Sequence, residues 1–318
     1  MTGNKAANFV QDRCLFLDRF MKQMSRFPYL LASDTFKAFS RPSGEIEKLL
    51  NMHPKATPEA IIERFKMKLF VDEFPDDSVV REAREQINEF QNFCKRIAPV
   101  LAKMKKESRI WVPVKNRHNH SFKQLIELLG EFEEQTITTY ADSNANKLVI
   151  GDINDTEIKD KVEEMNNNLK NPYHDFHTWV RGECDDIEAL YEAIKGRDRI
   201  AEMRNNLDKK KKSDAGSLDK LNQGKKTMKT LFKGQSGRQV EITNLTNNIA
   251  QAEKDVELYG RLVNMIEVYL AETVIPKFKE GKLDLYYSVI KEFGSAEISN
   301  AHQQATFWTS VLTNKNLS

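Results

Sequence analysis

A seven-residue hydrophobic repeat runs through much of the chain and limits the folds that it can adopt. Apolar side chains recur at alternating steps of three and four over Ile87–Met104, and the same phase returns over Phe122–Phe132. A second run of this kind covers Ile242–Leu270. Such spacing keeps apolar side chains on one face of an α-helix. The chain is therefore predicted to be all-α, an elongated bundle of three long helices that pack as in a coiled coil.

The repeat places the three long helices along the chain. The first is predicted over 78–140 as one kinked helix, and two helices broken near Pro113 fit the same pattern. The second is predicted over 155–212 with a bend at Asn171-Pro172, and the third begins near Ile242, is interrupted at Pro276 and then resumes. Because a slim three-helix bundle leaves apolar surface uncovered, we expect the chain to dimerise.

Other elements are short. Strand signals are limited to residues 110–114 and 147–150, and neither run has an evident partner. Two helices are expected near the N-terminus, over 6–25 and 34–40, and a third over 57–70, with Thr57 as its N-cap and Pro58 at its first position. These boundaries predict three parts: residues 1–42, a linker over 43–77, and a long-helix domain over 78–318.

Charge is distributed unevenly. The chain has a net charge of +2, but the segment from Arg204 to Arg238 holds eleven basic and three acidic residues and therefore carries +8, which leaves −6 for the rest. This concentration favours a contact with an anionic membrane surface. A solvated loop without a partner is the alternative, and nucleic acid is disfavoured because Phe232 is the one aromatic residue available for stacking. The candidate membrane-binding residues are Lys209, Lys210, Lys211, Lys212, Lys220, Lys225, Lys226, Lys229, Lys233 and Arg238.

The helix predicted over 57–70 is amphipathic. Four apolar side chains, Ile61, Ile62, Phe65 and Leu69, fall within about 100° of arc, and basic residues flank them. A helix of this kind can insert its apolar side chains into a membrane interface. It can equally pack against the bundle, since any surface helix has an apolar stripe.

Catalytic and metal-binding signals are weak. His174 and His177 lie three residues apart without further ligands, and Cys184 has no oxyanion-binding loop near it in the sequence. We therefore expect no enzyme, no metal and no cofactor. Three widely spaced cysteines favour a reducing, cytoplasmic setting, and no apolar run is long enough to span a membrane.

Several segments resemble the BAR domain of sorting nexins. Residues 122–134 are similar to the end of the first helix of that domain, 177–200 to the second helix, and 274–293 with Phe307-Trp308 to the last. Residues 13–42 resemble the closing helices of a phosphoinositide-binding PX domain, in which Arg13 is the plausible counterpart of a lipid-contacting residue. The sheet and Pro-rich loop of a PX domain have no counterpart here.

The resemblance implies a function. It implies a homodimer, or a heterodimer with another BAR-type nexin, that binds phosphoinositide or phosphatidylserine and senses or tubulates curved endosomal membranes during protein transport. The basic segment would lie at the tip of the dimer, and the helix over 57–70 would insert into the outer leaflet. Lys195, Arg197 and Arg199 are weaker candidates for further lipid contacts. A coiled-coil scaffold or tether that binds proteins and not lipid is the alternative.

Overall fold

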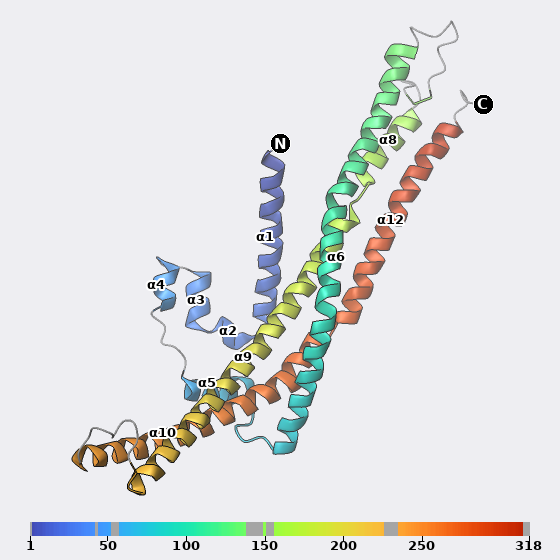
Figure 1. The fold of residues 1–318 in the computed structure, drawn as a ribbon. Coiled ribbons are helices and arrows are strands. Elements are labelled where there is room, and N and C mark those ends of the chain that lie inside the picture. Colours follow the sequence, from blue (N-terminus) through green and yellow to red (C-terminus); the bar gives the residue numbers. More distant parts are fainter. Residues whose placement is uncertain are drawn as a thin grey trace. The chain divides into compact units, whose positions relative to one another are not determined.

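The computed structural model describes residues 2–41, 44–51, 57–137, 149–150, 156–225 and 235–313, and it contains only helices and connecting segments there (Figure 1). The shorter helices come first in the chain. They are α1 (Thr2–Ser25), α2 (Pro28–Leu31), α3 (Asp34–Ser40), α4 (Ile46–Asn51) and α5 (Pro58–Leu69). The all-α prediction is confirmed for these residues. Of the two runs with strand signals, residues 110–114 are helical, and Val149-Ile150, the described part of the second run, form a bend.

The later helices are longer. They are α6 (Asp77–Phe132), which ends in the π-helical turn η1 (Glu133–Ile137), then α8 (Thr156–Asn168), α9 (Pro172–Asn222) and α10 (Gln235–Tyr269), followed by the π-helical turn η3 (Leu270–Val274), α11 (Ile275–Lys279) and α12 (Lys282–Leu312). Gly281 adopts a left-handed conformation with φ of 69° at the start of α12, which a residue without a side chain adopts at little cost.

α6 is one uninterrupted helix, so the alternative of two helices broken near Pro113 is wrong. Contacts on both sides of Pro113 hold the helix in place. Before it, Ser108 is buried and its Oγ lies 2.9 Å from Nδ1 of His177. After it, the side chain of Asn119 is buried and donates to the carbonyl of Lys170. Tertiary packing thus compensates for the hydrogen bond that a proline removes.

The second predicted helix is wrong in both extent and continuity. It is divided at residues 169–171 into α8 and α9, because Asn171 caps α9: its Oδ1 accepts from the N–H of Tyr173, and its Nδ2 donates to the carbonyl of Val112. Pro172 then occupies the first helical position. At its other end α9 continues to Asn222, ten residues beyond the predicted end at Lys212.

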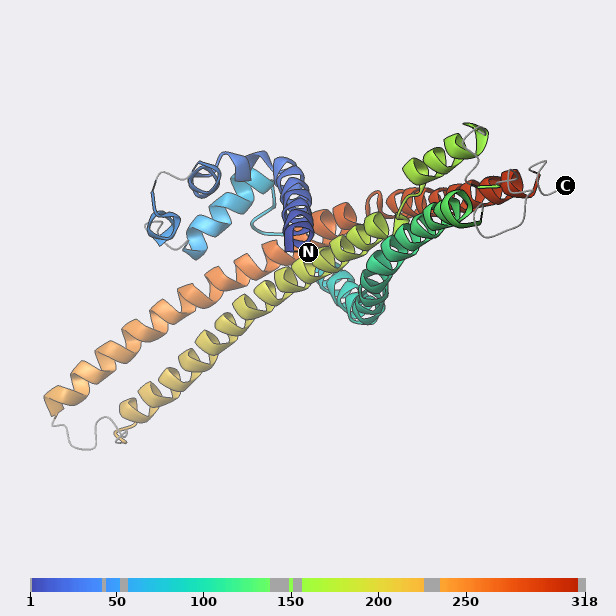
Figure 2. The same cartoon turned by 90° about the horizontal axis from the view of Figure 1, so that it is seen from above.

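The chain divides into two compact units. Unit 1 comprises residues 1–76 and 200–266, and unit 2 comprises residues 77–199 and 267–318. In unit 1 the second half of α9 runs beside α10, as both views show (Figures 1 and 2). The core of unit 1 includes Ile62, Leu262 and Met265. A core cluster of unit 2 gathers Ile126, Met165, Phe307 and Val311, with Val149 and Ile150 packed against it.

The buried face of α6 departs from a strict seven-residue repeat. Ile87, Phe90, Cys94 and Leu101 are buried as the repeat predicts. Ser108, the next residue of the repeat, is buried too. Farther along, Asn119 and Ile126 take the buried positions, whereas the predicted positions Trp111, Leu125 and Phe132 are 47%, 51% and 46% exposed. A helix with 3.6 residues per turn drifts by about 20° per heptad relative to such a repeat. The drift leaves part of the predicted core on an open surface.

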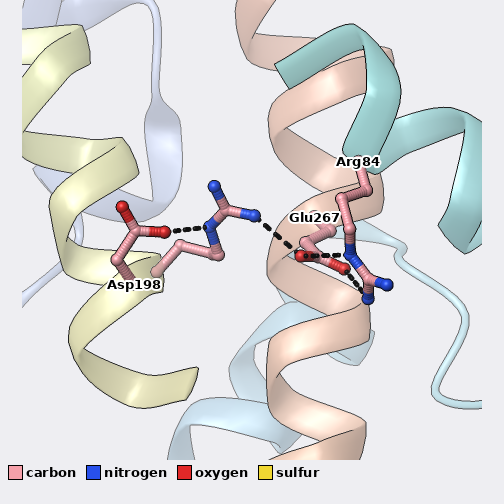
Figure 3. A network of polar contacts seen from close by, with 4 residues as sticks. Arg84, Asp198 and Glu267 are labelled. Atoms are coloured by element: carbon pink, nitrogen blue, oxygen red, sulfur yellow. Dashed lines mark hydrogen bonds and ion pairs between the residues drawn. The ribbon is translucent and has the colours of Figure 1, made fainter. Parts of the chain in front are cut away.

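A buried charged network joins three helices of unit 2 (Figure 3). The carboxylate of Glu267 on α10 is 2% exposed and accepts two hydrogen bonds from Arg84 of α6, at 3.2 and 2.9 Å. It also accepts from Nη1 of Arg197 on α9, at 2.8 Å. Asp198 makes an ion pair with Nε of Arg197 at 2.8 Å. Glu267 therefore neutralises Arg197, whose side chain is 8% exposed.

Candidate functional site

The basic residues predicted to bind membrane lie partly on a helix. We name the α9 tip as the segment 209–225, which includes the last turns of α9. Within it, Lys209, Lys210, Lys220 and Lys225 are exposed, and no ion pair involves them among the described residues. Lys226, Lys229 and Lys233 lie outside the described residues. The α9 tip thus presents four cations to solvent from ordered backbone.

Two other lysines of the α9 tip are already paired. Lys212 lies 2.7 Å from the carboxylate of Asp208, and Lys211 lies 3.8 Å from Asp208 and 3.9 Å from Glu253 of α10. The hydrogen bond from Lys212 lowers the pKa of Asp208 below its ordinary value. These pairs offset part of the positive charge, so Lys211 and Lys212 attract an anionic surface less than their unpaired neighbours do.

Arg238 has a structural role at this end of unit 1. Its guanidinium, on α10, donates to the backbone carbonyl of Leu221 on α9. Leu221 is fully buried, and its carbonyl belongs to the last turn of the helix, where such groups lack partners within the helix. The contact ties the end of α9 to the start of α10, and it explains why α9 continues through a segment rich in Lys, Ser and Gly.

The weaker candidates on α9 in unit 2 are engaged in ion pairs. Arg197 is buried against Glu267 as described above, so its guanidinium is not free for a headgroup. Lys195 and Arg199 both face Glu192, at 2.7 and 3.8 Å. The hydrogen bond from Lys195 lowers the pKa of Glu192. None of the three is an unpaired cation.

The apolar face of α5 is covered by its own unit. Thr57 caps the helix as predicted, since its Oγ1 accepts from the N–H of Ala60. Ile62 is 5% exposed and packs in one cluster with Leu262 and Met265 of α10, and Ile61 and Phe65 pack against that cluster. Leu69 is half-buried. Three of the four side chains predicted to enter a membrane, Ile61, Ile62 and Phe65, therefore pack against protein.

Glu73 fastens the segment that follows α5. We name residues 70–76 the strap. The Glu73 carboxylate accepts from Arg261 of α10 at 2.7 Å and lies 2.8 Å from Nζ of Lys66 on α5. Its side chain is 16% exposed. The hydrogen bond from Lys66 and the neighbouring positive charges lower the pKa of Glu73. One carboxylate thus links the strap, α5 and α10.

This pairing predicts a dependence of stability on pH. Because the pKa of Glu73 is lowered in the folded chain, its ion pairs stabilise the fold above the ordinary pKa of a glutamate, near 4.5. That stabilisation is lost as the pH falls through the lowered value. In urea unfolding, Glu73→Gln should be less stable than the wild type at pH 7, and the difference should shrink as the pH falls through the lowered pKa of Glu73. A difference that is unchanged across this range would contradict the assignment.

A second candidate site is an open apolar surface on unit 2. α12 buries Asn300, Phe307 and Val311 on one side. On another side, over about 120° of arc, it exposes a row of large apolar side chains along its whole length. They are Leu283, Tyr286, Tyr287, Ile290, Ile298, Trp308 and Leu312. Among the described residues, α12 therefore has one apolar face that is covered and one that is exposed.

α6 contributes to the same surface. Its exposed apolar residues include Val100, Trp111, Val114, Leu125, Leu128 and Phe132. Side-chain contacts join the edges of the two rows: Nζ of Lys115 lies 2.9 Å from the carboxylate of Glu297, and the rings of Phe122 and Trp308 meet edge to face at 6.3 Å. We name these two rows together the α6–α12 surface.

The aromatic residues beside this surface pack in sequence. Trp111 stacks on Tyr173 with ring centroids 5.3 Å apart, Tyr173 meets Phe293 at 5.0 Å, and Phe293 meets Phe176 at 5.4 Å. Trp179 continues the series to Tyr286 at 5.8 Å. These contacts hold the exposed rings of Trp111 and Tyr286 in place.

The remaining candidates from the sequence are the histidines near residue 177 and Cys184. Ser108 and His177 form a hydrogen-bonded pair inside the bundle, where Ser108 is 4% exposed. Burial raises the pKa of the Cys184 thiol, which keeps it protonated at neutral pH. Among the described residues, no group of three or more His, Cys, Asp or Glu is arranged to hold a metal, and no helix is long and apolar enough to cross a membrane.

Arg13 lies on α1, where its side chain is exposed. It has a contact within the chain and is not a free cation. The nearby helices meet through aromatic residues, since Phe20 of α1 and Phe39 of α3 pack edge to face at 6.1 Å. This region therefore has local packing of its own, but the described contacts assign no ligand to Arg13.

Two features of these sites were not predicted. The heptad repeat assigns Trp111 and Leu125 to the core, so it does not predict the position of the α6–α12 surface. The drift of a straight helix relative to that repeat does indicate that these residues leave the core. The exposure of Phe70, which is 87%, had no signal in the sequence. No protein-family model matches this chain, and no curated protein matches it.

Proposed function

We propose that this chain is a peripheral membrane protein that binds anionic membrane surfaces, phosphatidylserine or phosphoinositide, through the α9 tip. The observation that carries the proposal is the group of four exposed lysines, Lys209, Lys210, Lys220 and Lys225, at one end of a helix pair. A lysine near an anionic leaflet contributes about 1 kcal/mol, so four of them give a useful affinity at moderate ionic strength.

We further propose that the chain acts as a dimer of the BAR type, paired with a second copy or with a related nexin. The α6–α12 surface supports this proposal because it is long, apolar and, apart from the paired Glu297, without charge along the exposed row of α12. Stable interfaces bury about 1,600 Å² in total, so a dimer of this kind would have to use both rows. A rigid dimer with cationic tips would bind curved endosomal membranes and sense or stabilise their curvature.

Charge reversal at the α9 tip tests lipid binding. Lys209→Glu with Lys210→Glu should weaken binding to vesicles of phosphatidylcholine with one fifth phosphatidylserine by about thirtyfold or more, because two attractive charges become repulsive. Lys211→Glu with Lys212→Glu is the matched control, with the same change in net charge. Its loss should be clearly smaller, because both lysines already face Asp208.

Two outcomes would oppose the proposal. Equal losses in both pairs would mean that net charge alone, and not the exposed lysines, determines binding. Unchanged binding in both would remove the α9 tip as the lipid contact. Dimerisation without any vesicle binding would favour the alternative function, a helical scaffold or tether for proteins, which the α6–α12 surface also suits.

A further inference from the structure

The strap presents apolar side chains to solvent beside two cations. Phe70 and Phe74 are 87% and 66% exposed, and Met67, one turn before the strap, is 66% exposed. Arg261 lies under the ring of Phe74, with its guanidinium carbon 5.5 Å from the ring centroid. These side chains all belong to unit 1 and lie away from the apolar face of α5 that packs on α10.

Phe70 is held in an unfavourable conformation. Its φ is 55° and its ψ is 36°, the left-handed region that glycine or asparagine usually occupies after a helix. The backbone there is fixed by hydrogen bonds, including one from the N–H of Val71 to the carbonyl of Phe65. A side chain that costs conformational energy and is almost fully exposed contributes little to the folded chain. Its position is better explained by a contact outside the chain.

The two cations beside these rings converge on one anion. Lys66 and Arg261 both bind the carboxylate of Glu73, at 2.8 and 2.7 Å. The Nε of Arg261 is buried and makes no hydrogen bond among the described residues. A phosphate has more acceptor oxygens than a carboxylate and suits such a pair of donors. Glu73 thus occupies a position where a phosphate would be bound more completely.

We infer that Lys66, Arg261, Phe70 and Phe74 form a second lipid site, in which the two cations take the phosphate of an anionic headgroup and the two rings enter the interface. This inference rests on the proposed function and adds a site to it. Glu73 would hold the cations in place when no membrane is present. The site differs from the predicted insertion of Ile61, Ile62, Phe65 and Leu69, because those residues stay packed and α5 remains docked.

Membrane binding by the strap requires the rings of Phe70 and Phe74, because charge alone does not attract the strap to an anionic surface. Glu63, Asp72 and Asp76 lie on or beside it, and Glu63 is 3.7 Å from Lys66. Aromatic side chains favour the membrane interface and supply the attachment that these acidic residues oppose. The α9 tip would provide the long-range attraction, and the strap would provide a local contact.

Phe70→Gly separates this role from a structural one. Glycine adopts the left-handed conformation readily, so the variant should unfold at the same temperature as the wild type or higher. Its binding to phosphatidylcholine vesicles with one fifth phosphatidic acid should be about tenfold weaker. A tenfold loss corresponds to roughly half of the transfer free energy of a phenylalanine side chain. Met203→Asn, at a 49% exposed position of α9, is the control and should bind as the wild type does.

Glu73→Gln tests the phosphate contact. It removes the competing charge, so binding to the same vesicles should tighten several-fold, whereas Glu63→Gln should have a smaller effect. Inorganic phosphate at about 10 mM, compared with chloride of equal ionic strength, should not remove the gain. If it does, the pair binds free phosphate and the lipid assignment is overturned.

Two further outcomes distinguish the second site from the proposed function. If Phe70→Gly binds vesicles as tightly as the wild type while Lys209→Glu with Lys210→Glu shows the expected weakening, the second site is absent and the proposed function stands. If the wild type itself does not bind anionic vesicles, the proposed function fails first.

Discussion

Ile290→Glu combined with Ile298→Glu should convert the protein from a dimer to a monomer. Both side chains lie on the exposed row of α12, at 40% and 72% exposure, and a dimer through this row would bury four carboxylates next to apolar partners. Residues at the centre of such interfaces each contribute about 2 kcal/mol or more, so the dissociation constant should rise by about three orders of magnitude. Sedimentation equilibrium measures it directly against the 36.8 kDa mass of the chain.

The control for this experiment is on the same helix. Leu285→Glu changes a side chain that is 46% exposed but lies on another side of α12, outside the row. It should leave the dimer intact. A wild type that sediments as a monomer at micromolar concentration, or a dimer that Leu285→Glu breaks as strongly as the double variant, would contradict the proposed interface.

Glu267→Gln should destabilise the fold by about 3 kcal/mol or more. The substitution keeps the shape of the side chain but removes the buried carboxylate from Arg197, whose side chain is 8% exposed, and leaves the half-exposed Asp198 as its remaining acidic partner. Breaking a buried ion pair by removing one partner costs about 3–5 kcal/mol, because the remaining charge is desolvated and unpaired. Urea unfolding at pH 7 and constant protein concentration measures the loss.

Two comparisons make this test specific. Glu192→Gln, which removes the exposed partner of Lys195, should cost far less, because solvent screens an exposed ion pair. Glu267→Met combined with Arg197→Met should recover most of the stability, because replacing both partners leaves no buried charge. A loss below about 1 kcal/mol for Glu267→Gln would show that the network is not essential for holding the three helices together.

Much of the helical structure could be predicted because each element has a local signal. The steps of three and four from Ile87 onward, and the Thr57-Pro58 start of α5, specify helices without reference to the rest of the chain. The division at Asn171-Pro172 had a signal too, but a bend and a break look alike until the side chain of Asn171 is seen to cap α9.

The remaining differences depend on contacts between distant residues. The helical extension to Asn222 relies on Arg238, which reaches the carbonyl of Leu221 from α10. A helical wheel identifies the apolar face of α5 correctly, but it does not say that Leu262 and Met265 cover that face. Likewise, Glu267 shows in the sequence as an ordinary acidic residue, and only the fold brings Arg84 and Arg197 to it.

Vesicle sedimentation of the wild-type chain tests the central claim most directly. Phosphatidylcholine vesicles with one fifth phosphatidylserine should carry the protein into the pellet at 0.1 M salt, and the bound fraction should fall steeply by 0.5 M salt, because exposed charges are screened. Pure phosphatidylcholine should pellet little of it. Binding that is equal on both kinds of vesicle, or absent from both, would contradict the proposal that this protein recognises anionic membranes.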